Sequence, residues 1–481
     1  MSAPRPNVLF VMADDHAAGA VSANGSRIMR TPAIDRLGSE GARFDRAFCE
    51  NSLCTPSRAA ILTGVYSHVH GATTLDTPFD ARQPAFPGLL RDAGYQTMLV
   101  GKWHLGHGGV HDPNGFDRWS VLPDQGEYHD PTFLQPGGRA VVRLGYVTDV
   151  ITDVALAWLA ERDRTKPFCL LVHHKAPHRP WEPAPRHAGL FECEDVPEPP
   201  TLRDDYSGRA SPAREARMRI AEHLTEQDLK GPVPPGLSGD AELCWRYQRY
   251  IKDYLRCVAA LDDSVRRLLD ALDAEGVADD TVVVYTSDQG FFLGEHGWYD
   301  KRFMDEGSIR MPLLVRYPRL VPPGSVMDRI VVNVDFAPTL LELGGAPIPD
   351  RMQGRSLVPL LTGTPPPDWR TAMYYRYWMH LDSIHRVGAH YGIRTERFKL
   401  IHYYGQACGQ PGAAGERQPP EWELFDLTAD PFELSSVYHD PQYATVVEQL
   451  TRELHRVQQE LGDTPANGSA GRQAEHQKGA R

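Results

Sequence analysis

Residues 7–15, NVLFVMADD, decide the fold, because an unbroken apolar run leads directly into a pair of aspartates. Apolar character that is continuous rather than alternating is typical of a strand buried on both faces of a parallel sheet. Adjacent residues of a strand point to opposite faces, so Asp14 and Asp15 can serve one ligand only where the strand has ended. The stretch therefore predicts a central strand with a polar site beyond its carboxyl end.

Continuous apolar runs alternate with helical patterns as far as about residue 364. Further strands are predicted at 96–103, 168–174, 281–287 and 311–318, and helices at 31–41, 146–162, 245–276 and 334–345. This alternation predicts an α/β fold in which helices sandwich a large, mainly parallel sheet. A Pro-rich, charged stretch at 179–240 is predicted to be a long insertion that shapes a site or moves.

The pattern changes near residue 365. Antiparallel strands are predicted at 370–378, 391–404 and 421–433, followed by a helix at 445–461. We therefore expect a main α/β domain over 1–364, a small α+β subdomain over 365–461 and a disordered tail over 462–481.

Composition excludes some classes of partner. The 481-residue chain is 41% hydrophobic and 24% charged, and its formal net charge is −12, which argues against nucleic acid and anionic membrane surfaces. No apolar run approaches membrane-spanning length. Its seven cysteines lack CxxC spacing, which indicates reduced thiols without a zinc cluster. Because the N-terminal residues lead straight into the first strand, we expect no signal peptide and a cytoplasmic location.

The stretch SLCTPSRAAILTG (52–64) places a cysteine where a loop turns into a helix. Pro56 suits the first turn of a helix, and Gly64 suits its end. Cys54 is therefore predicted just outside a helix N-terminus, an environment that favours an anion. The alternative is that Cys54 is a small buried hydrophobic residue, as free cysteines often are.

A second acidic stretch ends a later strand. Asp288 and Gln289 follow TVVVYTS (281–287), as Asp14 and Asp15 follow the first strand. Sites in open parallel sheets form beyond the carboxyl ends of the strands, so both pairs are expected at one edge. Three carboxylates and an amide oxygen suit Ca²⁺ or Mg²⁺ better than Zn²⁺. The alternative for either pair is a solvated turn or a helix cap.

Cations and histidines follow other strands. Lys102 and His104 in GKWHLG share a face, because residues i and i+2 do so in a strand. His178 lies in HHKAPHRPW (173–181), between two prolines that stiffen the segment, and is a candidate general acid. Lys301 and Arg302 follow the Asp288 loop. Surface lysines and hydrogen-bonded histidines are the alternative interpretation.

With these motifs in place, the chain resembles a type I sulfatase of the alkaline phosphatase superfamily from Asn7 to about residue 440. CTPSRAAILTG matches the C-x-P-S-R-x-x-x-L-T-G signature in full, and the other motifs occur in the family's order: NVLFVMADD, GKWHLG, APHRPW, SDQGFFLGEHGWYDKR and GIRTERFKLI. The resemblance implies an alkaline phosphatase-like catalytic domain over 1–364. It also implies that a separate maturation enzyme oxidises Cys54 to formylglycine, whose hydrate is the nucleophile.

The resemblance further implies a role for each site residue. Ca²⁺, or Mg²⁺, would be held by Asp14, Asp15, Asp288 and Gln289 together with the modified Cys54. Arg58 would help to activate the nucleophile. Lys102, His178 and Lys301 would neutralise the sulfate oxygens, His178 would protonate the leaving alcohol, and His104 would remove a proton from the remaining hydroxyl to expel sulfate.

For the substrate, the motifs look most like those of carbohydrate sulfatases acting on 6-sulfated N-acetylglucosamine or similar units. Arg302, Trp378, His380 and His385 are candidate sugar-binding residues, in an aromatic and histidine group that also includes Tyr377 and His390. Ordinary packing between domains is the alternative for that group. Phosphonate or phosphate ester hydrolysis, arylsulfatase activity on small molecules, and an inert binding protein remain rival functions.

Overall fold

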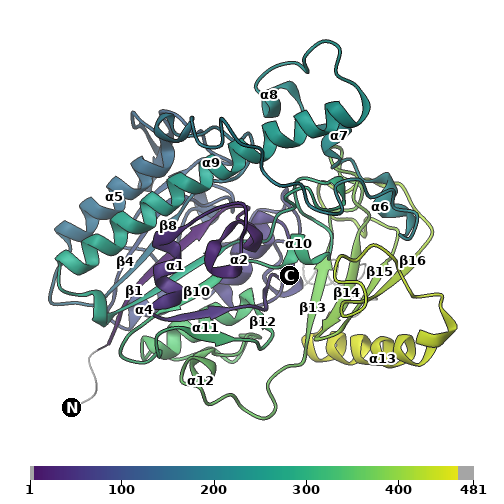
Figure 1. Cartoon of the computed structure of the whole chain (residues 1–481). Coiled ribbons are helices and arrows are strands. Elements are labelled where there is room, and N and C mark those ends of the chain that lie inside the picture. The colour runs from purple at the N-terminus through teal and green to yellow at the C-terminus, as the bar shows by residue number, and fades with distance from the viewer. Residues whose placement is uncertain (1–4, 464–481) are drawn as a thin grey trace, which may run out of the picture.

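The computed structural model describes residues 5–463, which form a large sheet flanked by helices and a smaller sheet beside it (Figure 1). The large sheet has ten strands in the order β11-β2-β10-β9-β1-β8-β4-β5-β6-β7. In that order their bounds are Ser325–Met327, Ala42–Phe44, Leu313–Arg316, Thr281–Ser287, Asn7–Ala13, Phe168–His173, Gln96–Lys102, Arg118–Leu122, Thr132–Gln135 and Arg139–Val142. A separate pair joins β3 (Ala47–Phe48) to β12 (Val331–Val332).

Strand β1 lies in the middle of the sheet and is buried on both faces, as its apolar run predicts. Its parallel neighbours are β8 and β9. Alternate residues of β1 enter two separate cores, with Val8 and Phe10 in one and Leu9 and Val11 in the other. A strand with a core on each side has no polar face, which explains its continuous apolar sequence.

Helices cover both faces of this sheet. One face carries α1 (Pro32–Ser39), α5 (Val147–Glu161) and the long α9 (Gly239–Ala274), which pack against one another. The other carries α2 (Cys54–Thr63), α4 (Phe86–Asp92) and α11 (Phe336–Leu343), with the short α12 (Val358–Leu361) against α11. The α/β architecture expected from the sequence is therefore confirmed.

The sheet is parallel at its centre and mixed toward its edges. β10 runs antiparallel to both β9 and β2. β6 and β7 continue the opposite edge as antiparallel strands. Strands β6 and β7 were not predicted, because they are short and their exposed residues break the continuous apolar pattern.

Residues beyond about 370 form a four-stranded antiparallel sheet, with α13 (Ala444–Leu461) packed against it (Figure 1). Its strands are β13 (Ala372–Tyr377), β14 (His390–Thr395), β15 (Phe398–Tyr403) and β16 (Glu421–Asp426). The single strand predicted at 391–404 is wrong, since a tight turn divides it into the β14–β15 hairpin. The turn residues Glu396 and Arg397 gave no glycine or proline signal.

The stretch 179–240 contains short helices between longer loops: α6 (Ser211–Glu215), α7 (Ile220–His223) and α8 (Glu226–Leu229). Two more short helices occur elsewhere, α3 (Ser67–His70) and α10 (Glu306–Ile309). None of the helices within 5–463 is both long and apolar enough to cross a membrane.

The packed structure continues two residues past the end of α13. Gly462 ends the helix in a left-handed conformation, and Asp463 is buried and accepts a 2.7 Å hydrogen bond from the Tyr374 hydroxyl. The rest of the predicted tail, 464–481, lies outside the described residues.

Candidate active site

Three aspartates meet at the carboxyl edge of the central strands. Ala13 and Ser287 are paired at the ends of β1 and β9, so the acidic residues that follow are neighbours. Asp14, Asp15 and Asp288 each offer an oxygen within 4.8 Å of the others, and all three are buried. The Asp15 backbone N–H donates to Asp288 Oδ1 at 3.2 Å. The structure therefore places the three carboxylates at one edge of the sheet, as the strand ends predicted.

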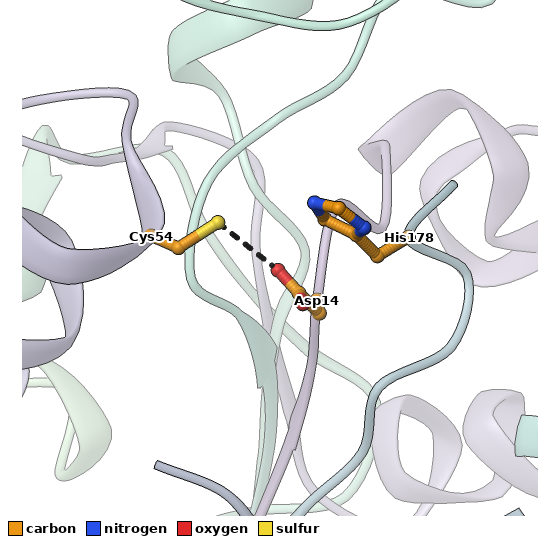
Figure 2. Close-up of side chains that lie close together, drawn as sticks. All are labelled: Asp14, Cys54 and His178. Carbon is orange, nitrogen blue, oxygen red and sulfur yellow. Dashed lines mark hydrogen bonds between the residues drawn. The ribbon is translucent and has the colours of Figure 1, made fainter. Parts of the chain in front are cut away.

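Cys54 faces this carboxylate group from the N-terminus of α2. Its thiol donates to Asp14 Oδ1 at 3.3 Å, and Figure 2 shows the Cys54, Asp14 and His178 side chains converging. The structure makes Cys54 the first residue of the helix, after the N-cap Leu53, rather than a residue just outside it. The difference is one position, and the sulfur still lies where helix N–H groups are unpaired.

Arg58, one turn along α2, ties the helix to the carboxylates. Its Nε donates to Asp288 Oδ2 at 3.0 Å, and Nη2 lies 3.6 Å from Asp14 Oδ1. Its Nη1 also donates to the Lys102 carbonyl at 2.9 Å. The guanidinium thus fixes the relative position of three motifs that are far apart in the sequence.

Two lysines compensate the remaining negative charge. Lys102 Nζ donates to Asp14 Oδ2, and Lys301 Nζ donates to Asp15 Oδ1 and Oδ2 at 2.6 and 2.7 Å. Lys301 Nζ also lies 3.7 Å from Cys54 Sγ. Both ammonium groups are therefore directed at the place where the Cys54 side chain would react.

The two candidate proton-transfer histidines border the same group. His178 Nδ1 donates to the Arg179 carbonyl at 2.7 Å, which leaves Nε2 facing the site, 3.7 Å from Asp15 Oδ2. His104 has φ of 53°, and its carbonyl accepts from Thr55 Oγ1 at 2.8 Å. The His104 ring contacts Gln125, with 3.2 Å between the two Nε2 atoms, and its buried Nδ1 has no hydrogen-bond partner among the described residues.

The three carboxylates differ in the pKa that their surroundings give them. Burial raises the pKa of Asp15 to about 6 and that of Asp288 to about 7, with Asp14 adding to both increases. Burial would also raise the pKa of Asp14, but Lys102 and Arg58 hold it well below its ordinary value. Asp14 is therefore the most firmly ionised of the three.

Burial has the opposite effect on the histidines. It lowers the pKa of His104 and of His178 far below the ordinary value, and Lys102 contributes to both shifts. Burial, with Asp14, raises the pKa of the Cys54 thiol. The protein thus holds both rings neutral and the thiol protonated.

The donor set fits a hard divalent cation. Gln289 is fully buried, and its Oε1 is without a hydrogen-bond partner within the described part of the chain. A buried carbonyl oxygen left unpaired is costly unless a ligand satisfies it. Together with the three neighbouring carboxylates it forms the oxygen-only environment that Ca²⁺ and Mg²⁺ prefer.

Of the predicted sugar-binding residues, the structure brings Arg302 and His385 together. Arg302 Nη2 lies 2.7 Å from His385 Nδ1, and the His385 ring nitrogens Nε2 and Nδ1 lie 3.2 Å from Asp300 and 3.0 Å from Asp382. Arg302 is 4% exposed, yet Nε and Nη1 have no hydrogen-bond acceptor among the residues described. Its guanidinium therefore retains donors for another group.

Trp378 and His380 have other partners. The Trp378 indole N–H donates to Ser67 Oγ at 3.1 Å, and its ring stacks on Arg376, 3.4 Å from the guanidinium carbon to the ring centre. His380 Nδ1 accepts from the Ala389 N–H at 3.0 Å. These contacts support the packing alternative for both residues.

Sequence reasoning missed Gln125, Asp300 and Asp382. Gln125 Oε1 accepts from Lys102 Nζ at 2.5 Å, and its Nε2 lies 3.2 Å from His104 Nε2. Recognition of β5 as a strand would have placed Gln125 at the same sheet edge. Asp300 lies within the motif SDQGFFLGEHGWYDKR, and its position next to Lys301 was the signal that could have identified it as a site residue.

Comparison with known proteins adds the evolutionary relationships. Residues 6–346 match the model of the sulfatase family, and 294–460 match that of the N-sulphoglucosamine sulphohydrolase C-terminal region. An N-acetylglucosamine-6-O-sulfatase of Bacteroides thetaiotaomicron is 43% identical over 504 residues, covering 95% of this chain and 87% of that protein.

Two further comparisons agree. The N-acetylglucosamine-6-sulfatase of Homo sapiens is 30% identical over 396 residues, covering 78% of this chain and 67% of that protein. A solved structure of a protein with its substrate, D-glucosamine-2-N,6-O-disulfate, superposes with a TM-score of 0.90 at 43% identity. The match covers 96% of this chain and 99% of that one.

Proposed function

The chain belongs to the sulfatase family, and we propose that it hydrolyses the 6-O-sulfate ester of N-acetylglucosamine or of N-sulfated glucosamine. The convergence of a metal-type carboxylate group, Arg58 and two lysines on Cys54 carries the proposal. The substrate is supported by the 43% identical N-acetylglucosamine-6-O-sulfatase and by the related disulfate complex.

The nucleophile would come from Cys54. A protonated, buried thiol is a weak nucleophile, so unmodified Cys54 is poorly suited to attack sulfur. Formylglycine, made from Cys54 by a maturation enzyme as is typical of the family, would supply a hydroxyl of its aldehyde hydrate instead. Helix α2 would hold that group against Asp14, as it now holds the sulfur.

Asp14, Asp15, Asp288 and Gln289 would hold Ca²⁺, or Mg²⁺, which would polarise a sulfate oxygen and the nucleophile. Positively charged side chains of the protein would stabilise the rest of the negative charge that develops during the reaction. Lys102 and Lys301 are buried ammonium groups, and Arg58 is held in place by Asp288. Fixed positive charge in a site that excludes water stabilises a developing anion strongly.

The two histidines would move the protons. His178 carries its neutral-state proton on Nδ1, because the Arg179 carbonyl can only accept, so Nε2 is free to bind the proton destined for the leaving alcohol. The negative sulfate ester would raise the proton affinity of Nε2. His104, on the other side, would accept the proton of the hydroxyl that remains after sulfur is attacked.

Arg302 and His385 would bind the sugar. Within residues 5–463, Arg302 Nε and Nη1 make no hydrogen bond, although Nε lies 3.8 Å from Asp300 Oδ1, and the neighbouring His385 contacts Asp300 and Asp382. Paired donors at fixed spacing suit neighbouring hydroxyl oxygens or an anionic substituent of a pyranose ring. This role rests on the unpaired guanidinium donors, and Trp378 and His380 are left out of it.

The proposal is tested by measuring sulfate release from 6-sulfated N-acetylglucosamine, with a simple aryl sulfate alongside, using protein co-expressed with a maturation enzyme. We expect preference for the sugar. Turnover of the aryl ester alone would retain a sulfatase and overturn the sugar assignment. Phosphonate or phosphate esters could use the same nucleophile and cations, so phosphate release is measured in parallel, and a preference for it would overturn sulfate chemistry.

A further inference from the structure

We propose that the unconverted protein, with Cys54 still a cysteine, is a binding site for a thiophilic divalent cation such as Zn²⁺, held by Asp14, Cys54 and His178. This site is separate in chemistry from the oxygen-only set of Asp14, Asp15, Asp288 and Gln289. It needs the sulfur atom, so it exists before Cys54 is oxidised and disappears afterwards.

The geometry of the three side chains carries the inference. One ligand atom from each lies within 4.8 Å of the other two, and all three residues are buried. With bonds of about 2.0–2.3 Å, ligand atoms of a tetrahedral zinc ion lie roughly 3.3–3.6 Å apart. Cys54 Sγ and Asp14 Oδ1 are already 3.3 Å apart, and the His178 nitrogen, within 4.8 Å of both, would move closer when the ion binds.

The three ligands come from three separate elements: a helix N-terminus, the end of a strand and a loop (Figure 2). Cys54 is held by α2, and Asp14 by the end of β1. Three protein ligands with one open position are the usual arrangement of a zinc ion that keeps a bound water. A mixed sulfur, nitrogen and oxygen set favours Zn²⁺ over Ca²⁺, which prefers oxygen ligands alone.

The surroundings of His178 favour metal binding. Zinc-bound histidines ordinarily donate their second ring N–H to a carbonyl or carboxylate, which fixes the ring and its tautomer. His178 Nδ1 already makes such a bond, to the Arg179 carbonyl at 2.7 Å. Its Nε2 lone pair is therefore left for a ligand on the side of the site, where Asp15 Oδ2 is 3.7 Å away.

The charge balance distinguishes the unconverted protein from the converted one. The site holds three carboxylates against Lys102, Lys301 and Arg58. When a cation binds sulfur, the thiol proton is released to solvent and the thiolate adds one negative charge. Neither an aldehyde nor its hydrate supplies that charge or a sulfur ligand, so conversion of Cys54 removes the preference for a thiophilic ion.

The experiment uses full-length protein produced without a maturation enzyme, stripped with a chelator and reloaded with Zn²⁺ or Co²⁺. We expect about one equivalent of bound Zn²⁺ and, with Co²⁺, a thiolate-to-metal absorption band. Cys54→Ser should reduce both to background, while His178→Ala should weaken Zn²⁺ binding by about 10–100-fold. Cys193→Ser, which removes an exposed thiol, is the matched control and should change neither.

Zinc retained by Cys54→Ser, or a cobalt complex without the thiolate band, would overturn the proposal. Converted and unconverted wild-type protein are compared as well, because this pair needs no substitution that could disturb folding. Equal zinc content in that pair would also overturn it. The readouts are metal content and absorbance, so the result is independent of which ester the enzyme hydrolyses.

Discussion

Two regions of this protein bury several charged residues, and they differ in what their charges leave unpaired. The catalytic group at the sheet edge contains the three aspartates, Arg58, Lys102 and Lys301. The second region, the domain-joining group, links the α/β domain to the C-terminal sheet. Its members are Arg209, Asp305, Glu306, Arg394, Lys399, Glu423 and Glu433.

In the domain-joining group each carboxylate has an arginine or lysine partner. Lys399 Nζ lies 3.0 Å from Glu306 Oε1 and donates to Glu433, and Arg209 Nε donates to Glu423 Oε1 at 2.9 Å. Arg209 Nη1 and Asp305 Oδ1 make no hydrogen bond but lie 3.0 Å apart as an ion pair, whereas around the catalytic group the uncharged atoms Gln289 Oε1 and His104 Nδ1 lack partners among the residues described. Buried charges that satisfy one another hold domains together, whereas a group with unpaired atoms is ready for a ligand.

The largest expected effect tests the catalytic side of this comparison. Cys54→Ala removes the proposed precursor of the nucleophile, so sulfate release should fall by about 10⁴-fold or more. Cys169→Ala is the matched control, because it removes a thiol buried in β8 among apolar neighbours. It should lower the thermal midpoint and leave turnover per folded molecule unchanged. Substantial turnover by Cys54→Ala would remove Cys54 from the chemistry.

The next effect separates the two groups by comparing two buried lysines. Lys301→Met removes an ammonium group that is 3.7 Å from Cys54 Sγ, so kcat should fall by about 10²–10³-fold. Lys399→Met removes a buried lysine of the domain-joining group, and kcat measured per folded molecule should not change. Similar kcat losses in both variants would break the distinction between the groups.

For the free energy of unfolding, we expect the larger loss in the domain-joining group. Lys399→Met leaves Glu433 without a cationic partner and Glu306 with Arg394 alone, so the free energy of unfolding should fall by about 3–5 kcal/mol in a urea titration. The control is Arg452→Met, whose pair with Glu448 is exposed on both sides and should cost less than about 1 kcal/mol. A small loss for Lys399→Met would show that the buried pairs do not stabilise the domain junction.

A pH dependence is expected from Glu50, which precedes the Cys54 motif. Burial raises its pKa to about 8, opposed by hydrogen bonds from Ser67, and the unfolded chain keeps the ordinary value near 4.5. A raised folded-state pKa contributes stability below the unfolded value, and that stability is lost as pH rises through the folded value. Between pH 5 and 8, wild type should therefore lose on the order of 3 kcal/mol relative to Glu50→Gln. Parallel melting profiles of the two proteins would contradict this.

The smallest effect concerns substrate choice. Arg302→Lys removes a planar donor pair, so KM for 6-sulfated N-acetylglucosamine should rise by about tenfold. KM for a small aryl sulfate, which has no sugar hydroxyls, should not change. Arg397→Lys, at the exposed hairpin turn of the C-terminal sheet, is the control. Equal changes in KM for both substrates would show that Arg302 does not bind the sugar specifically.

The catalytic group could be predicted from the sequence because its residues follow strongly apolar strands. Asp14, Lys102 and Asp288 each come directly at or after the end of such a strand, and strand direction alone brings them together. The domain-joining group has no comparable signal. Lys399 and Glu433 are separated by a strand and a long loop, and only the folded hairpin of the C-terminal sheet brings them into contact.

The sequence left other features undecided for physical reasons. The antiparallel direction of β10 is invisible in its composition, because a strand buried on both faces has the same apolar sequence in either direction. Gln125 was missed because β5 was not recognised. Arg302 and His385 were predicted together with Trp378 and His380 on composition, and only side-chain contacts separate the two pairs.

The buried end of the described chain bears on how the protein is truncated or fused. Asp463 lies beyond α13, where it accepts hydrogen bonds from Tyr374 and from Arg376, whose guanidinium also stacks on Trp378. Cutting the gene after residue 461, where the helix ends, would leave that guanidinium buried without its carboxylate. A cut or a fusion junction placed after residue 463 keeps the anchor, and with it the contact between Trp378 beside the C-terminal sheet and Ser67 at the start of α3.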